Sequence, residues 1–148
     1  MKGESGMKYV LVLWLVLFAP SSGAADGVPS DFSPTVGDAL LCLDKIDPVY
    51  FNGYLQASFG PPYKTVGDRK WYRVDEKLWG KEQVTDVIVG DTPPFLGAII
   101  QDSSQGTAAA ILATIGIRYA FDNGDGVSPE YGEITLYNGL AEVFCQQN

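Results

Sequence analysis

Histidine is absent from this chain of 148 residues, and cysteine and methionine occur only twice each. Without histidine, the chain cannot build a histidine-based catalytic triad, a histidine zinc site or an imidazole acid–base group. It also lacks the glycine-rich motifs that bind phosphates in P-loop and dinucleotide-binding proteins. These absences favour a binding protein over an enzyme, and we expect neither a cofactor nor a metal.

Positive charge is scarce as well. The chain has 10 Lys and Arg residues against 18 Asp and Glu, which gives a formal net charge of −8 at pH 7. A protein with this charge repels a polyanion, so we expect no nucleic acid among its partners. The acidic composition favours solubility, and it can also attract a basic protein partner.

Long apolar runs are missing except at the start of the chain. Residues 9–19 (YVLVLWLVLFA) follow Lys2 and Lys8, and Pro20 ends the run. The run is shorter than the ~20 residues that a membrane-spanning helix needs, but it has the length of a signal-peptide core. We therefore expect a signal peptide, with an uncleaved membrane anchor as the alternative.

Small residues at the end of this segment favour cleavage after Ala24. The expected organisation is a cleaved signal peptide over residues 1–24, a flexible leader over 25–32 and one domain over 33–148. Such a protein would be periplasmic or secreted. No later stretch is apolar enough to enter a membrane.

The two cysteines, Cys42 and Cys145, belong to the expected domain. In an exported chain an even number of cysteines favours a disulfide, and with two cysteines only one pairing exists. The alternative is a reactive thiol, which needs an activating histidine or a helix N-terminus. The chain has no histidine, and Cys42 lies among apolar residues. We therefore expect a structural disulfide between Cys42 and Cys145.

Cap and turn signals divide the domain into helices and strands. Ser33-Pro34 and Asp47-Pro48 each combine an N-cap residue with proline at the first helical position. The pattern leaves residues 95–100 open between a strand and a helical turn. The expected helices are residues 35–46, 49–58 and 107–114, and the expected strands are residues 70–74, 83–89 and 115–121, with a turn near 75–77.

The segment 133–145 (EITLYNGLAEVFC) predicts a hairpin, because Asn138 and Gly139 both tolerate the positive φ angles of a type I′ turn. The expected cross-strand pairs are Tyr137 with Leu140 and Ile134 with Val143.

The grouping of helices and strands predicts an α+β domain with a mainly antiparallel sheet and helices packed on one face. Two helix-to-strand junctions look alike, LQASFG at residues 55–60 and LATIG at 112–116. Each leads into an aromatic-containing strand and a hairpin. A duplicated helix-plus-hairpin unit would explain this likeness, and chance is the alternative.

A helix that ends in Phe-Gly-Pro precedes a short loop with glycine and then Trp-Tyr on a strand (FGPPYKTVGDRKWYRV, residues 59–74). This layout resembles the β-lactamase-inhibitor-protein-like fold, which also includes small outer-membrane assembly lipoproteins. The resemblance covers residues 59–74 only, and the chain lacks a lipoprotein cysteine after its expected signal peptide. The resemblance implies a module that binds proteins through its sheet.

The scarce cations are concentrated in one place. Residues 64–82 hold six of the ten cations and only four acids, and they include two of the three tryptophans. On a strand, Arg69, Trp71 and Arg73 share one face, which could present an indole flanked by two guanidiniums. Because Trp, Tyr and Arg dominate interface hot spots, this hairpin is a candidate contact surface. The candidate binding residues are Arg69, Trp71, Arg73 and Trp79, with Tyr63 at the rim.

The leading hypothesis is therefore an exported protein-binding module, such as an inhibitor or immunity-type factor, that acts through residues 69–82. A simpler reading places the aromatic residues in the core and pairs the cations with nearby acids. Two further alternatives are a carbohydrate- or small-ligand-binding module that uses the same aromatics, and an enzyme with carboxylate chemistry.

An acidic loop, Asp122–Glu133 (DNGDGVSPEYGE), has the length of a calcium-binding loop with acids at both ends. Glycines occupy its third and fifth positions, and Val127 stands where the sharp-turn glycine belongs. These departures remove most of the ligands, so the pattern favours an acidic hairpin loop without calcium.

Overall fold

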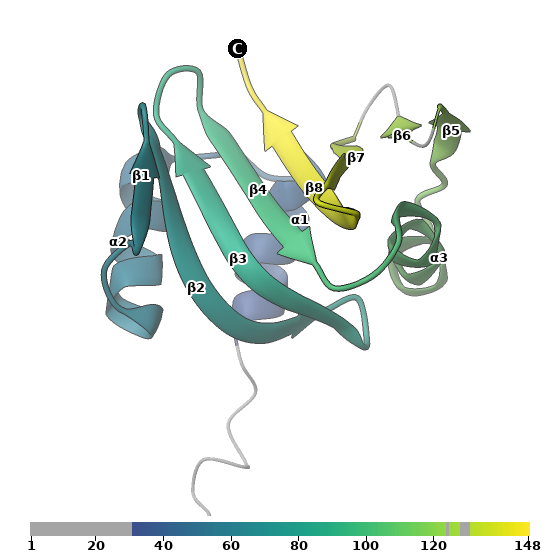
Figure 1. Ribbon diagram of the computed structural model, residues 1–148, viewed down its shortest axis with the longest axis horizontal. Coiled ribbons are helices and arrows are strands. Elements are labelled where there is room, and N and C mark those ends of the chain that lie inside the picture. The colour runs from purple at the N-terminus through teal and green to yellow at the C-terminus, as the bar shows by residue number, and fades with distance from the viewer. Residues whose placement is uncertain (1–30, 124, 128–130) are drawn as a thin grey trace, which may run out of the picture.

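A computed structural model describes residues 31–123, 125–127 and 131–148 of the chain (Figure 1). The expected signal peptide, its cleavage site and residues 25–30 of the expected leader lie outside the described residues. Among the described residues, no helix is long and apolar enough to cross a membrane.

One antiparallel sheet of eight strands forms the centre of the described structure, in the order β1-β2-β3-β4-β8-β7-β6-β5. The expected α+β class with a mainly antiparallel sheet is confirmed. The strands are β1 (Lys64–Val66), β2 (Arg69–Leu78), β3 (Glu82–Gly90), β4 (Phe95–Ile100), β5 (Ala120–Asp122), β6 (Asp125–Val127), β7 (Glu133–Tyr137) and β8 (Leu140–Gln146).

All helices pack on one face of this sheet, as expected. Figure 1 shows α1 and α2 behind the sheet and α3 beside its β5–β7 end. Residues of α1, α2 and α3 belong to one buried cluster with Val87, Leu96 and Val143 of the sheet. The helical elements are a π-helical turn η2 (Ser33–Gly37), α1 (Asp38–Leu40), α2 (Pro48–Phe59) and α3 (Ser104–Ile115).

Local capping explains where the two long helices begin and end. The Asp47 side chain accepts hydrogen bonds from the backbone N–H groups of Val49 and Tyr50 at the start of α2. Ser103 caps α3 in the same way through the N–H of Gly106. Gly116 ends α3 with a left-handed φ of 85°.

The two halves of the chain repeat the same connectivity. Each half has a helix of 12 residues followed by a four-stranded antiparallel meander, α2 with β1–β4 and α3 with β5–β8. The last strands of the two meanders, β4 and β8, pair with each other at the centre of the sheet. The likeness of residues 55–60 and 112–116 therefore falls at equivalent places, the C-terminal ends of α2 and α3.

The expected disulfide between Cys42 and Cys145 is present, and it joins the loop after α1 to β8. The Asn-Gly hairpin is confirmed as well, with φ of 50° at Asn138 and 80° at Gly139. Both expected cross-strand pairs of this hairpin occur in the β7–β8 register, Tyr137 with Leu140 and Ile134 with Val143.

Three expected boundaries are wrong. The first helix ends at Leu40 instead of 46, because the chain turns at Cys42 (φ 56°) to reach its disulfide partner. The turn expected at 75–77 is a β-bulge inside β2, and the chain reverses at Trp79 and Gly80 instead. Most of the strand expected at 115–121 is absent, because α3 continues to Ile115 and β5 begins only at Ala120.

Phe32 was expected to belong to a flexible leader, but it packs in the core with 1% exposure. Its ring meets the Phe59 ring edge-on at 5.8 Å between centroids. The ordered domain therefore begins before residue 33.

Candidate binding surface

Side-chain alternation along β2 decides which of its faces is buried. Tyr72 is fully buried toward the helices, and its hydroxyl donates a 2.6 Å hydrogen bond to Asn52 of α2. Because successive side chains of a strand alternate, Arg69, Trp71 and Arg73 lie on the opposite face. That face carries no helix in the described structure, and three of the expected binding residues are thus on the open side of the sheet.

The open face is strongly curled. In the strand register the row through Trp71 crosses Ile88, Gly97 and Phe144 and reaches β7 at Glu133. Four strand spacings separate β2 from β7, about 19 Å in a flat sheet. Yet the Trp71 ring lies 5.3 Å from the Tyr137 ring of β7. The sheet must therefore curl toward this face, which makes the face concave.

A small second core forms the floor of this concave face. Ile88, Phe95 and Ile99 are at most 3% exposed, although they point away from the helices. The half-buried side chains that cover them are Trp71, Tyr137, Leu140 and Phe144. At Gly97 an added Cβ would lie 2.9 Å from the Phe95 ring, so the bare backbone there lets the ring fold over the sheet. The aromatic floor is thereby closely packed.

Three cations lie over aromatic rings on this side of the molecule. The Lys64 ammonium is 4.3 Å from the Trp71 ring centroid, and the Arg69 guanidinium is 3.9 Å from that of Phe95. The Arg73 guanidinium is 4.5 Å from the Tyr63 ring centroid. Each ring face attracts its cation and holds the long side chain in place. We call Tyr63, Lys64, Arg69, Trp71 and Arg73 the cation–aromatic surface.

Tyr63 and Arg73 are tied together at the edge of this surface. The Tyr63 hydroxyl donates a 2.5 Å hydrogen bond to Asp86 Oδ1, and Arg73 Nε lies 3.5 Å from the same oxygen. Burial and the hydrogen bond to Asp86 raise the pKa of Tyr63. The Arg73 side chain is nevertheless 70% exposed. Its guanidinium is anchored at one end and presented to solvent at the other.

Other acids near these cations also accept hydrogen bonds from groups outside the surface. Asp68 accepts hydrogen bonds from the backbone of Thr92 and Asp91, and these bonds together with the charge of Arg69 lower its pKa. Asp75 accepts a 2.7 Å hydrogen bond from Gln83. Glu82 is hydrogen-bonded to Asp102. The simpler reading therefore holds in part. Arg73 pairs with Asp86, the charge of Arg69 acts on Asp68, and Tyr72 and Trp79 are buried in the core.

One carboxyl does face the cations from across the concave side. Glu142 of β8 is half-buried, and burial raises its pKa, whereas the charge of Arg69 acts in the opposite direction. Glu142 is therefore an internal carboxyl that interacts with Arg69 across the concave face.

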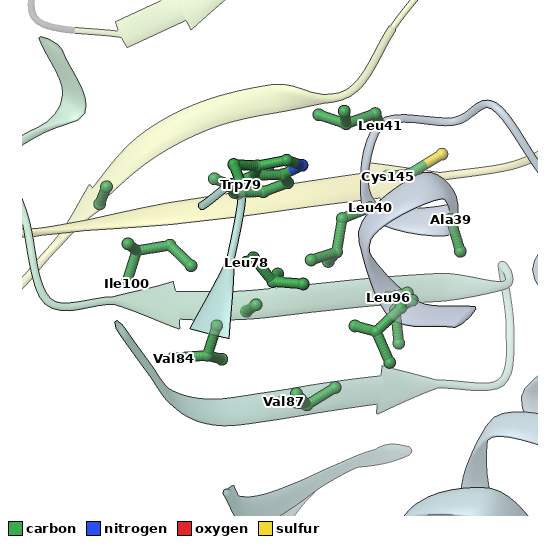
Figure 2. Packing of buried hydrophobic residues seen from close by; sticks show 14 of the residues in the cluster. Ala39, Leu40, Leu41, Leu78, Trp79, Val84, Val87, Leu96, Ile100 and Cys145 are labelled. Atoms are coloured by element: carbon green, nitrogen blue, oxygen red, sulfur yellow. The ribbon is translucent and has the colours of Figure 1, made fainter. Parts of the chain in front are cut away.

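The expectation that Trp79 is a binding residue is wrong. It is 4% exposed and lies among Leu40, Leu41, Leu78 and Ile100 in the helix-side core (Figure 2). Its φ of 48° at the β2–β3 turn directs the side chain inward. Trp79 therefore contributes to stability and is not available to a partner in this conformation.

Sequence reasoning missed several residues of this surface. Lys64 was counted among the six clustered cations, but nothing placed it over Trp71. Phe95, Tyr137 and Phe144 come from β4, β7 and β8, and only the strand order brings them to the floor. The alternation of side chains along β2 predicted only that Arg69, Trp71 and Arg73 share one face.

Comparisons with models of known protein families, with curated proteins and with solved structures found no match. The resemblance noted for residues 59–74 therefore stays an expectation. Within the described part of the chain, no group of three or more Cys, Asp and Glu side chains could hold a metal ion. The acidic loop at 122–133 is only partly described, because residues 124 and 128–130 lie outside.

Proposed function

We propose that the protein is an exported module that binds another protein through its cation–aromatic surface, as an inhibitor or immunity-type factor would. The observation that carries this proposal is the set of three cation–ring contacts on one side of an acidic chain. The disulfide is compatible with an oxidising compartment outside the cytoplasm.

The residue types and their rigidity support this role. Tryptophan, tyrosine and arginine dominate interface hot spots, and here they surround a floor that is already packed. A surface ordered before binding loses little conformational entropy when a partner docks. Exposed Tyr63 (46%) and Val66 (56%) extend the apolar area at the β1 edge.

A pull-down from the extracellular or periplasmic fraction of the source cells would test the proposal. The wild-type protein should retain a specific partner, and Trp71→Ala or Arg73→Ala should weaken that complex. Lys77→Ala provides the matched control, because Lys77 is an exposed cation of the same strand outside the surface. Retention of the same partner by all three variants would contradict the proposal.

A second candidate function rests on a separate observation. A cavity of about 400 Å³ lies between η2 and α2. It combines aromatic and charged lining residues, as small-ligand and sugar sites do. The lining residues are Pro34, Thr35, Asp44, Lys45, Tyr50 and Phe51. Tyr50→Ala should then abolish any sugar-induced change in the protein's NMR spectrum, and the absence of such a change with common mono- and disaccharides would count against this candidate.

A further inference from the structure

We infer that the cation–aromatic surface takes an acidic segment of the partner protein, whose carboxylates reach Arg69, Lys64 and Arg73. This inference rests on the proposed function and deepens it, because it commits to the chemistry of the partner. The net negative charge of the whole chain would by itself favour a basic partner, so the inference rests on this surface and not on the net charge.

Unused hydrogen-bonding capacity is the first support. The Arg69 and Lys64 side chains are exposed, and each lies over a ring face, which attracts the charge but accepts no ordinary hydrogen bond. The charge of Arg69 also acts on Asp68 and Glu142. A guanidinium has five N–H donors, and Arg73 directs only its Nε toward Asp86. Carboxylates supplied by a partner would occupy the outward-facing donors in bidentate geometry.

Spacing is the second support. Arg69 and Arg73 are four residues apart on one strand face, about 13 Å at the usual rise of a strand. Lys64 lies between them, because it pairs with Trp71 in the β1–β2 register. The backbone positions of the three cations are therefore close together on β1 and β2, whereas the Arg69 guanidinium lies over Phe95 of β4 and the Arg73 guanidinium over Tyr63 next to β1. An extended partner segment with carboxylates four residues apart could reach both arginines, with the apolar side chain midway between them on Trp71.

The exposure of the cations is the third support. Asp86 lies 3.5 Å from Arg73 Nε, and the charge of Arg69 acts on Asp68 and Glu142, so the acids of the chain offset part of the positive charge here. The Arg73 side chain is nevertheless 70% exposed, and Lys64 and Arg69 are exposed as well, so all three remain open to a partner carboxylate. The surrounding acidic protein repels a long polyanion but not a short acidic segment, which favours a protein partner over a nucleic acid.

Two synthetic nonapeptides with blocked ends provide the test. One has the sequence Gly-Ser-Glu-Ser-Tyr-Ser-Glu-Ser-Gly, which places the tyrosine between the two Glu residues on one face, and its twin has Gln in place of both Glu residues. Each is titrated into the full ¹⁵N-labelled chain at low and at physiological salt. The backbone signals of β1 and β2 and the Trp71 indole N–H signal are followed by NMR.

The Glu peptide should bind about tenfold more tightly than its Gln twin, as expected for two surface ion pairs. Salt should weaken its binding, because the charges are solvent-exposed. Arg69→Gln with Arg73→Gln should remove the advantage of the Glu peptide, whereas Lys77→Gln should leave it intact. Unchanged thermal unfolding of the double variant would show that it is folded.

Equal binding of both peptides at this surface would overturn the acidic-segment inference but leave the protein-binding proposal standing. No binding of either peptide would also overturn the inference, and the pull-down would then decide the proposal by itself. A short oligothymidylate that bound as tightly as the Glu peptide would show a general anion site and would overturn the inference too.

Discussion

The ring of Trp71 on β2 lies 5.3 Å from the ring of Tyr137 on β7, although three strands separate β2 from β7 in the sheet. This contact closes the floor of the concave face, and it holds Trp71 in position between Arg69 and Arg73. The geometry of the cation–aromatic surface therefore depends on a residue that is distant in the sequence.

Coupling between these two rings can be measured. Trp71→Ala and Tyr137→Ala should each lower the free energy of unfolding, and a double-mutant cycle should give a coupling of about 0.5–1.5 kcal/mol, the usual range for an aromatic pair. Urea unfolding of the four proteins provides the data. Leu136→Ala is the control partner, because Leu136 is 56% exposed and lies on the other face. Additivity of the Trp71 and Tyr137 effects would contradict the closed floor.

The disulfide should contribute strongly to stability. Cys42 and Cys145 are 103 residues apart, and in the chain-entropy model a loop of this size corresponds to roughly 4–5 kcal/mol, an upper value in practice. Replacing both cysteines by Ala should lower the free energy of urea unfolding by about 2–5 kcal/mol. Adding reductant should destabilise the wild type but not the variant. A variant as stable as the oxidised wild type would refute this prediction.

Glu82 should make stability depend on pH. Its side chain is 4% exposed, and burial together with a hydrogen bond to Asp102 raises its pKa from 4.5 to about 7. The folded state therefore binds this proton more tightly than the unfolded state. The resulting stability is fully present below about pH 4.5 and is lost as the pH rises through 7.

Urea unfolding at several pH values between 4.5 and 8 would test this effect. Glu82→Gln should flatten this decline in the free energy of unfolding, which is on the order of 3 kcal/mol for a pKa raised from 4.5 to about 7. Glu133→Gln, which changes an exposed carboxylate of β7, should keep the wild-type profile. If the Glu82→Gln profile matched that of the wild type, the buried proton would not belong to Glu82.

Two helical glycines should respond in opposite ways to alanine. Gly53 of α2 is exposed, and a Cβ there meets no atom within 4 Å, so Gly53→Ala should stabilise the protein by about 0.5–1 kcal/mol. At Gly106 of α3 a Cβ would clash with the Asp102 carboxylate that holds Glu82. Gly106→Ala should therefore destabilise the protein and reduce its pH dependence. Equal stabilisation by both substitutions in thermal unfolding would disprove the close contact.

Features set by neighbouring residues were predictable from the sequence. The Asn138-Gly139 turn fixes its own hairpin register, and two cysteines permit only one pairing. The alternation of β2 placed Arg69, Trp71 and Arg73 on a common face. The helices capped by Asp47 and Ser103 also followed from short-range signals, with errors at their ends.

Features set by long-range packing were not predictable in this way. The charged residues 75–77 have the composition of a turn. Glu76 and Lys77 pair with β3 after a β-bulge instead, and the chain reverses only at Trp79. The burial of Trp79 depends on Leu40 and Leu41, which the shortened first helix brings over the sheet. The contact between Trp71 and Tyr137 requires the crossover through α3 that places β8 next to β4.

Quenching of Trp71 fluorescence by small ions tests most directly whether the cation–aromatic surface is exposed and positively charged. The protein for this measurement carries Trp14→Phe and Trp79→Phe, so that Trp71 is its only indole. Because the Lys64 ammonium lies over the ring and Arg69 and Arg73 flank Trp71 on the same strand face, we predict that iodide quenches it more strongly than caesium. Arg69→Gln with Arg73→Gln should reduce this preference. Equal quenching by the two ions, or none by either, would contradict a cationic contact surface around Trp71.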